Sequence, residues 1–326
     1  MAELVRLALL GGFQYSFLAL GAMLTFRLLG FPDITVQGSF PLGAAMFAEL
    51  TTVANFGPLE ATICAIAAGA LAGTVTGALH TLLRIDAILS SILVATALNS
   101  IILIVMGGLP NISLLNVQSI FGAVLGSHAA NATGDGTIVA SGVLTVGVSV
   151  ALYWFLRTDF GILVRVVGTS QSMARSAGAN TGRVKIFTIA MGNGLAALSG
   201  AIVGQYVGSA DSGLGVGVVT VAIGSLILGE VLLGRRGMVK TIIGAAIVGP
   251  ILYEGVLNGA LLLGYSSDLF QLITSLLIAL VVLLSRVRDH LVEPFISTIL
   301  RSRRRRATLP GAGVVTVLSR TGEGTG

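Results

Sequence analysis

Polar side chains that stand inside otherwise apolar stretches are the residues of this chain with the chemistry to contact a polar solute. Such groups are costly at membrane depth and usually face a protein interior or a water-filled cavity. The candidates are Asp33, Thr35, Gln37, Ser39, Asn99, Asn193 and Gln205. Two alternatives stay open: the segment 31–39 (FPDITVQGS) is an ordinary cytoplasmic turn, or each amide only bridges neighbouring helices through a hydrogen bond.

A second polar stretch, 159–185, interrupts the apolar sequence with a group of basic side chains. Because Lys and Arg near the ends of membrane spans stay on the cytoplasmic side, this stretch is predicted to be cytoplasmic. Its basic residues are Arg165, Arg175, Arg183 and Lys185.

The centre of that stretch, from about residue 170 to residue 179, is predicted to form a short helix. Thr169 or Ser170 can cap its start, and Gly178 with Asn180 can end it through a left-handed turn. A short capped helix held between two membrane spans suits the docking of a soluble partner. The alternative is a connecting loop with no partner.

The composition requires many membrane-spanning helices to position these residues. Hydrophobic residues make up 54% of the chain and charged residues only 10%, which leaves too few polar groups for a soluble surface. Long apolar runs without alternation exclude an outer-membrane barrel. The fold class is therefore all-α, a polytopic helical membrane protein. The excess of basic residues is explained as a topology signal, so no nucleic-acid partner is expected.

The positions of Lys and Arg set the predicted topology. Each interval without a basic residue holds two apolar segments, as a helix that leaves the cytoplasm and another that returns require. About nine crossings are expected, with the C-terminus cytoplasmic and the N-terminus outside. Because 40–54 is short for a full span, the alternative is eight crossings with one re-entrant half-helix. The predicted spans are 7–26, 40–54, 60–79, 87–107, 137–156, 186–207, 216–233, 241–263 and 268–285.

Several kinds of catalytic chemistry are absent from the sequence. There is no phosphate-binding loop of the form G-x-x-x-x-G-K-[ST]. The three histidines are far apart, the single cysteine is Cys64, and no nucleophile with a paired base is recognisable. We therefore expect no catalytic residue, no metal site and no cofactor bound by this chain.

The run 165–208, RVVGTSQSMARSAGANTGRVKIFTIAMGNGLAALSGAIVGQYVG, resembles the signature region of permease subunits of bacterial ABC importers. It is similar to the branched-chain amino acid and simple-sugar permease superfamily. The pattern residues are Arg165, Gly168, Ala174, Gly178, Asn180, Lys185, Ala196 and Gly200. The segment 31–45 is similar to a subgroup near aromatic amino acid uptake systems. The likeness covers about residues 5–285, and the tail departs from it.

The resemblance implies a permease subunit of the inner membrane that lines the pathway of a small polar solute, with an amino acid favoured by the subgroup. ATP with Mg²⁺ would bind to separate ABC ATPase subunits, and an extracytoplasmic solute-binding protein would deliver the solute. A second copy or a related permease would complete the pathway. The implied ATPase-docking residues are Ser170, Gln171, Ser172, Ala174, Arg175, Gly178, Ala179 and Asn180.

The same reading divides the chain into a transmembrane permease domain, 1–285, whose coupling loop is 157–185, and a basic cytoplasmic tail, 286–326. Arginines in the tail are expected to contact membrane lipids, and its end is expected to be disordered. The competing hypothesis is a secondary transporter that works alone, driven by protons or ions through acids such as Glu49, Glu230 or Glu254. It predicts transport that needs no partner and is sensitive to uncouplers.

Overall fold

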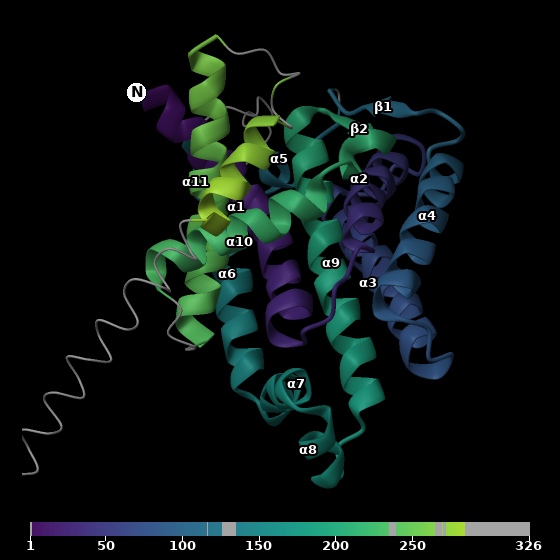
Figure 1. Ribbon diagram of the computed structural model, residues 1–326. Helices are drawn as coiled ribbons and strands as arrows, with labels where there is room; N and C mark the ends of the chain where they lie inside the picture. Colours follow the sequence, from purple (N-terminus) through teal and green to yellow (C-terminus); the bar gives the residue numbers. More distant parts are fainter. Residues whose placement is uncertain are drawn as a thin grey trace, which may run out of the picture. The chain divides into compact units, whose positions relative to one another are not determined.

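The computed structural model describes residues 2–115, 117–125, 135–234, 239–264, 269 and 272–283. This part of the chain is built almost wholly from helices (Figure 1). The elements are α1 Ala2–Ala22, η1 Met23–Leu28, α2 Val36–Thr52, α3 Pro58–Leu82, α4 Ala87–Val105, β1 Asn111–Ser113, α5 Ile120–Leu125, α6 Asp135–Arg157, α7 Asp159–Thr169, α8 Gln171–Ser176, α9 Thr181–Val207, β2 Ser209–Asp211, η2 Ser212–Gly215, α10 Val218–Leu233 and α11 Val239–Leu262, followed by a helix over Leu272–Leu283.

Six of the described helices are long and apolar enough to cross a membrane. They run over Glu3–Leu28, Pro58–Leu82, Ala87–Val105, Gly136–Arg157, Thr181–Val207 and Val239–Leu262. The all-α polytopic fold is thereby confirmed.

Two of the predicted spans are shorter than full crossings. The predicted span 40–54 is α2, which has 17 residues, and the span 216–233 is α10, which has 16. A helix rises 1.5 Å per residue, so each reaches only about 25 Å of a hydrocarbon core of about 30 Å. Within 268–285 the described helix is Leu272–Leu283.

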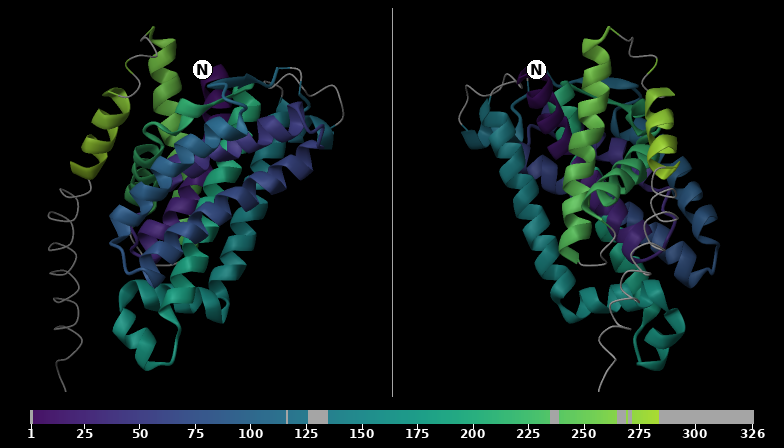
Figure 2. Two further views of the ribbon diagram at one scale, coloured as in Figure 1. Left: turned by 90° about the vertical axis from the view of Figure 1, so that its right-hand side faces the viewer. Right: turned by 60° about the vertical axis from the view of Figure 1, so that its left-hand side comes forward.

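Helix α9 lies at the centre of the bundle, packed against α1, α2 and α3 (Figures 1 and 2). Glycines every four residues make this close approach possible: a Cβ at Gly69 or Gly73 of α3 would meet the α9 backbone, and one at Gly200 of α9 would meet the carbonyl oxygen of Phe40 in α2. Small residues at such spacing let helix backbones approach closely. Gly69, Gly73 and Gly77 of α3 and Gly200 and Gly204 of α9 therefore serve packing inside one chain.

The two ends of the bundle differ in structure. Figure 1 shows α7 and α8 at one end and the β1–β2 ribbon at the other, with the N-terminus also at the ribbon end. The ribbon is antiparallel and pairs Ile112 with Ala210. This arrangement fits the predicted topology, in which α8 is cytoplasmic and the loop before α6 faces outward. The predicted tail, 286–326, and its arginines lie outside the described residues.

Candidate functional site

The first helix ends in a break that introduces polar residues into the bundle. The last turns of this helix form a π-helix, η1, whose wider turns often occur at functional sites. Gly30 follows with φ +67°, in the left-handed region that glycine adopts without a Cβ penalty, and Pro32 prevents the helix from continuing. The chain is then irregular until α2 begins at Val36.

The break places Asp33 in a fully buried hydrogen-bond network with residues of α2, α3 and α9. Asn193 Nδ2 donates to Asp33 Oδ2 at 2.7 Å, and Ser39 Oγ donates to Asn193 Oδ1 at 2.7 Å. The backbone N–H of Thr35 donates to Asp33 Oδ1 at 3.0 Å, and the hydroxyls of Thr35 and Thr76 are 2.8 Å apart. All five side chains are 0% exposed.

This network joins four of the seven predicted pathway residues and adds one that the sequence analysis missed, Thr76. A signal for Thr76 was available, because it shares a helix face with Gly69, Gly73 and Gly77 of the α3 stripe that packs on α9. Buried polar groups with every partner in place fix one arrangement of the helices that carry them. In the conformation described here the network therefore holds α2, α3 and α9 together, rather than facing an open cavity.

The other three predicted pathway residues lie elsewhere. Gln37 is half-buried on α2, and Asn99 is exposed on the outer face of α4. Gln205 lies near the β ribbon, where its Oε1 accepts a hydrogen bond of 2.8 Å from the backbone N–H of Ile120. None of the three takes part in the Asp33–Asn193 network. A pathway role for the seven residues remains a prediction.

Helix α8 forms where the sequence predicted a short capped helix. The Ser170 hydroxyl accepts from the backbone N–H of Met173, which caps the start. At the end, the N–H groups of Gly178 and Ala179 donate to the carbonyls of Arg175 and Ala174, and Gly178 has φ +80°. This pair of bonds around a left-handed glycine is the Schellman motif.

One predicted end signal works differently from what was expected. Asn180 does not end α8. Its side-chain oxygen accepts from the backbone N–H of Arg183 at 3.1 Å and so caps the start of α9. The physical reason is that the Schellman motif already satisfies the last carbonyls of α8, which leaves the Asn180 side chain free to serve the next helix.

The predicted docking residues divide into an exposed set and an inward set. Gln171, Ser172 and Arg175 are exposed, while Ala174 is 0% exposed. Ala174 packs in an apolar cluster with Leu29, Phe31, Val164, Val167, Val184 and Ile189. Ala174 therefore anchors α8 and offers no surface to a partner.

The anchor also connects α8 to the break in the first helix. Leu29 and Phe31 in that cluster come directly before Asp33, and a Cβ at Gly168 of α7 would meet the carbonyl oxygen of Leu28. Arg165 points back toward α6, where its guanidinium donates to the carbonyl of Leu156 at 3.4 Å. Packed side chains thus connect α8 to the segment that holds Asp33.

Two acidic residues of the helices have partners that bear on their predicted roles. The Glu230 carboxylate forms an ion pair with Arg27 of η1 at 2.7 Å. A pair of Glu230 with Arg235 and Arg236, which follow it closely in the sequence, is a further prediction. The short α10 returns Glu230 to the level of η1, and the two predicted partners lie outside the described residues. Glu254 accepts a 3.1 Å hydrogen bond from Asn258, four residues later on the same face of α11.

The architecture is that of a membrane transport subunit: a helical bundle with a broken first helix, a buried polar network at the break and a capped helix beyond one end. Residues 5–284 match the family described as branched-chain amino acid transport system / permease component, and the chain belongs to this family. It is therefore a multi-pass inner-membrane protein and a permease component of an ABC importer, without enzymatic activity of its own.

Individual proteins that are similar to this chain are also named as permease proteins. The tyrosine transport system permease protein of Clostridioides difficile (strain R20291) is 35% identical over 81% of this chain and 85% of that protein. The ribose import permease protein RbsC of Escherichia coli (strain K12) is 27% identical over 79% of this chain and 78% of that protein. The autoinducer 2 import system permease protein LsrC of Yersinia pseudotuberculosis is 31% identical over 72% of this chain. No solved structure matches this chain.

Proposed function

We propose that this chain lines the translocation pathway of an importer for an amino acid, an aromatic one of the tyrosine type, and is driven by ABC ATPase subunits that dock on α8. Two copies, or this chain and a related permease, form the pathway. An extracytoplasmic solute-binding protein delivers the solute. ATP and Mg²⁺ bind to the ATPase subunits, and this chain binds no cofactor.

The observation that carries the ATPase assignment is the construction of α8. The helix is capped at both ends, anchored by the buried Ala174, and presents Gln171, Ser172 and Arg175 outward. Met173 adds an exposed apolar side chain beside an apolar pocket of about 450 Å³ that Ile162 and Val166 also line. An exposed apolar residue among polar ones is typical of a contact surface for another protein.

The packing between α8 and the helix break supplies a route for coupling. Closure of the ATPase pair on ATP would bias the permease between two conformations, because ATP binds the closed pair more tightly. The cluster of Ala174 with Phe31 carries the displacement of α8 toward Asp33. The substrate assignment is supported by the relative that is named as a tyrosine transport permease and by the likeness of segment 31–45 to the aromatic subgroup.

Co-purification tests the ATPase assignment. The full-length chain is extracted from its native membrane in mild detergent and compared with Arg175→Glu and Gly178→Pro. Gly178 has φ +80°, which proline cannot adopt, so the second variant removes the end of α8. Arg157→Glu is the matched control, because Arg157 is an exposed cation of α6 that stacks on Tyr153 and is not part of α8. We expect an ATP-binding protein with wild type and Arg157→Glu but not with the two α8 variants.

Reconstitution tests the pathway and the substrate. Liposomes that contain the permease, its ATPase and its binding protein should accumulate labelled tyrosine only with ATP, and unlabelled ribose should not compete. Uptake by the permease alone that collapses with a proton uncoupler would instead establish the secondary transporter. Competition by ribose would keep the importer but refute the amino acid.

A further inference from the structure

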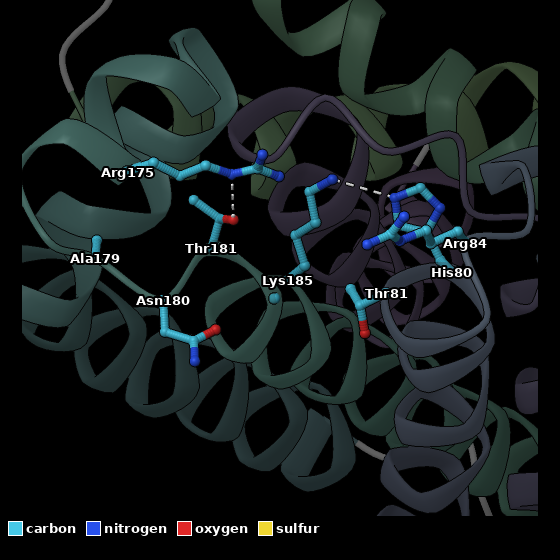
Figure 3. Close-up of a pocket in the computed structure, with 9 residues that line it drawn as sticks. His80, Thr81, Arg84, Arg175, Ala179, Asn180, Thr181 and Lys185 are labelled. Carbon is cyan, nitrogen blue, oxygen red and sulfur yellow. Dashed lines mark hydrogen bonds between the residues drawn. The ribbon is translucent and has the colours of Figure 1, made fainter.

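A basic pocket of about 770 Å³ lies beside α8, where the end of α3 meets the start of α9 (Figure 3). Three cations line it: Arg84 after α3, Arg175 of α8 and Lys185 of α9. Figure 3 shows the charged ends of Arg175 and Lys185 directed to the same space. The described residues that line the pocket include no acidic side chain.

Neutral partners hold two of these cations in place. His80 Nδ1 is 2.9 Å from the carbonyl oxygen of Ile85 and must donate there, so His80 Nε2 accepts from Lys185 Nζ at 3.1 Å. Arg175 Nε donates to Thr181 Oγ1 at 3.2 Å. The nearby carboxylate of Asp86 accepts from the backbone N–H of Ile88, where it caps α4. These hydrogen bonds therefore orient the cations of the pocket without neutralising them, and the pocket is suited to an anion.

The surroundings of Arg84 indicate which kind of anion the pocket binds. Leu82 and Leu83, which directly precede Arg84, are 73% and 65% exposed, and Ile88 beyond it is 47% exposed. Apolar side chains of a membrane helix that lie next to a cation place that cation at the level of the lipid headgroups. Basic pockets between membrane helices on the cytoplasmic side bind anionic headgroups. An acidic protein segment could bind the cations without the exposed Leu82, Leu83 and Ile88 beside them.

We propose that this pocket binds the phosphate group of an anionic phospholipid of the cytoplasmic leaflet. Arg84 and Arg175 donate to the phosphate oxygens, Lys185 adds a point charge that His80 positions, and the acyl chains run along the exposed leucines. The volume falls within the range of roughly 300–1,000 Å³ of sites that enclose small ligands. The proposal is independent of the solute that the permease carries, but it shares Arg175 with the docking surface proposed on α8.

Two substitutions remove charge from the pocket while keeping its structure. Arg84→Asn suits the backbone there, because Arg84 has φ 57° and asparagine is among the residues that tolerate this region best. Lys185→Gln leaves an amide N–H that can donate to His80 Nε2. Arg157→Gln is the control, since Arg157 is an exposed cytoplasmic arginine outside the pocket.

The measurement is native mass spectrometry of the full-length chain purified in mild detergent and titrated with phosphatidylglycerol, with phosphatidylcholine as the zwitterionic lipid. We expect a one-to-one phosphatidylglycerol adduct with wild type and Arg157→Gln. Each pocket substitution should weaken it by about fivefold, as expected for one cation near a headgroup. Circular dichroism should show unchanged helix content in all variants.

Four outcomes would overturn the lipid assignment. Equal adducts in all variants would show that the pocket binds no lipid, and equal loss with Arg157→Gln would show nonspecific attraction. Displacement of phosphatidylglycerol by millimolar inorganic phosphate would assign the site to soluble phosphate. Loss of the co-purifying ATPase from the pocket variants, with lipid retention intact, would assign it to an acidic protein surface.

Discussion

The side-chain amide of Asn193 donates a 2.7 Å hydrogen bond to the carboxylate of Asp33 across 160 positions of sequence. This bond joins the middle of α9 to the irregular segment that follows η1. The same amide group accepts from Ser39 through its oxygen, so one side chain satisfies partners on two segments. Because the three residues are 0% exposed, no water can replace a lost partner at this site.

Asn193→Ala should destabilise the permease by about 1–3 kcal/mol, the cost of leaving a buried polar group unpaired. Asn99→Ala is the matched control. Both asparagines occupy the middle of an apolar helix, but Asn99 is exposed, so its loss should change stability by less than about 0.5 kcal/mol. Thermal unfolding in detergent measures both. Equal midpoints for the two variants would contradict the structural role of Asn193.

Thr76→Val should weaken the contact between the helix break and α3, because it removes the hydroxyl 2.8 Å from that of Thr35 with little change of shape. The expected loss is about 1 kcal/mol. Thr74→Val serves for comparison: the Thr74 hydroxyl donates only to the carbonyl of Ala70 in its own helix, and its side chain is half-buried. The prediction fails if both valine variants unfold at the same temperature.

Gly200→Ala should be among the most damaging single-methyl additions in the chain. The new Cβ would meet the backbone carbonyl of Phe40, which cannot move without displacing α2, and overpacking of this kind costs about 1–3 kcal/mol. Gly147→Ala in α6 has no neighbour within 4 Å of the added Cβ and should gain up to about 1 kcal/mol from helix propensity. Shifts of opposite sign in the unfolding midpoint would verify this, and a stabilised Gly200→Ala would refute it.

Ser170→Ala should loosen α8 without unfolding the bundle. The variant loses the side-chain cap on the N–H of Met173, worth about 1 kcal/mol, in a helix of only 6 residues. Hydrogen exchange at the amides of α8 should accelerate about fivefold, while those of α9 stay unchanged. Ser176→Ala, outside the cap, is the control. Accelerated exchange throughout α9 would mean that the cap supports more than α8.

Local chemistry was enough to predict several parts of this structure. Apolar length and the distribution of basic residues indicated an all-α membrane protein, since nothing else can satisfy the backbone in lipid. The capped helix α8 was predicted from Ser170 and Gly178, because caps depend on residues within one turn. The break around Gly30 and Pro32 obeys the same short-range rules, although it was not predicted from these two residues.

The number of full crossings could not be derived in this way. The apolar run that contains α10 looks like an ordinary span in sequence, and the run 40–54 that contains α2 is only somewhat short, yet their helices have 16 and 17 residues. Where these helices begin depends on what they pack against. The chain leading into α2 is held by Asp33, and α10 starts at Gly217, which adopts φ +80° after the β ribbon. Asp33 bonds to the distant Asn193, and the ribbon before Gly217 is held by its pairing with the distant β1.

The sequence by itself determined that a few polar residues lie at membrane depth, and that a short capped helix interrupts the spans. Only the tertiary structure decided which of those residues act together. Asn99 and Asn193 have the same kind of apolar neighbours in sequence, but one is exposed on α4 and the other is buried between α2 and α3. Helical periodicity fixes the face on which a side chain lies, whereas the partner of that face is set by packing between segments that are far apart in the chain.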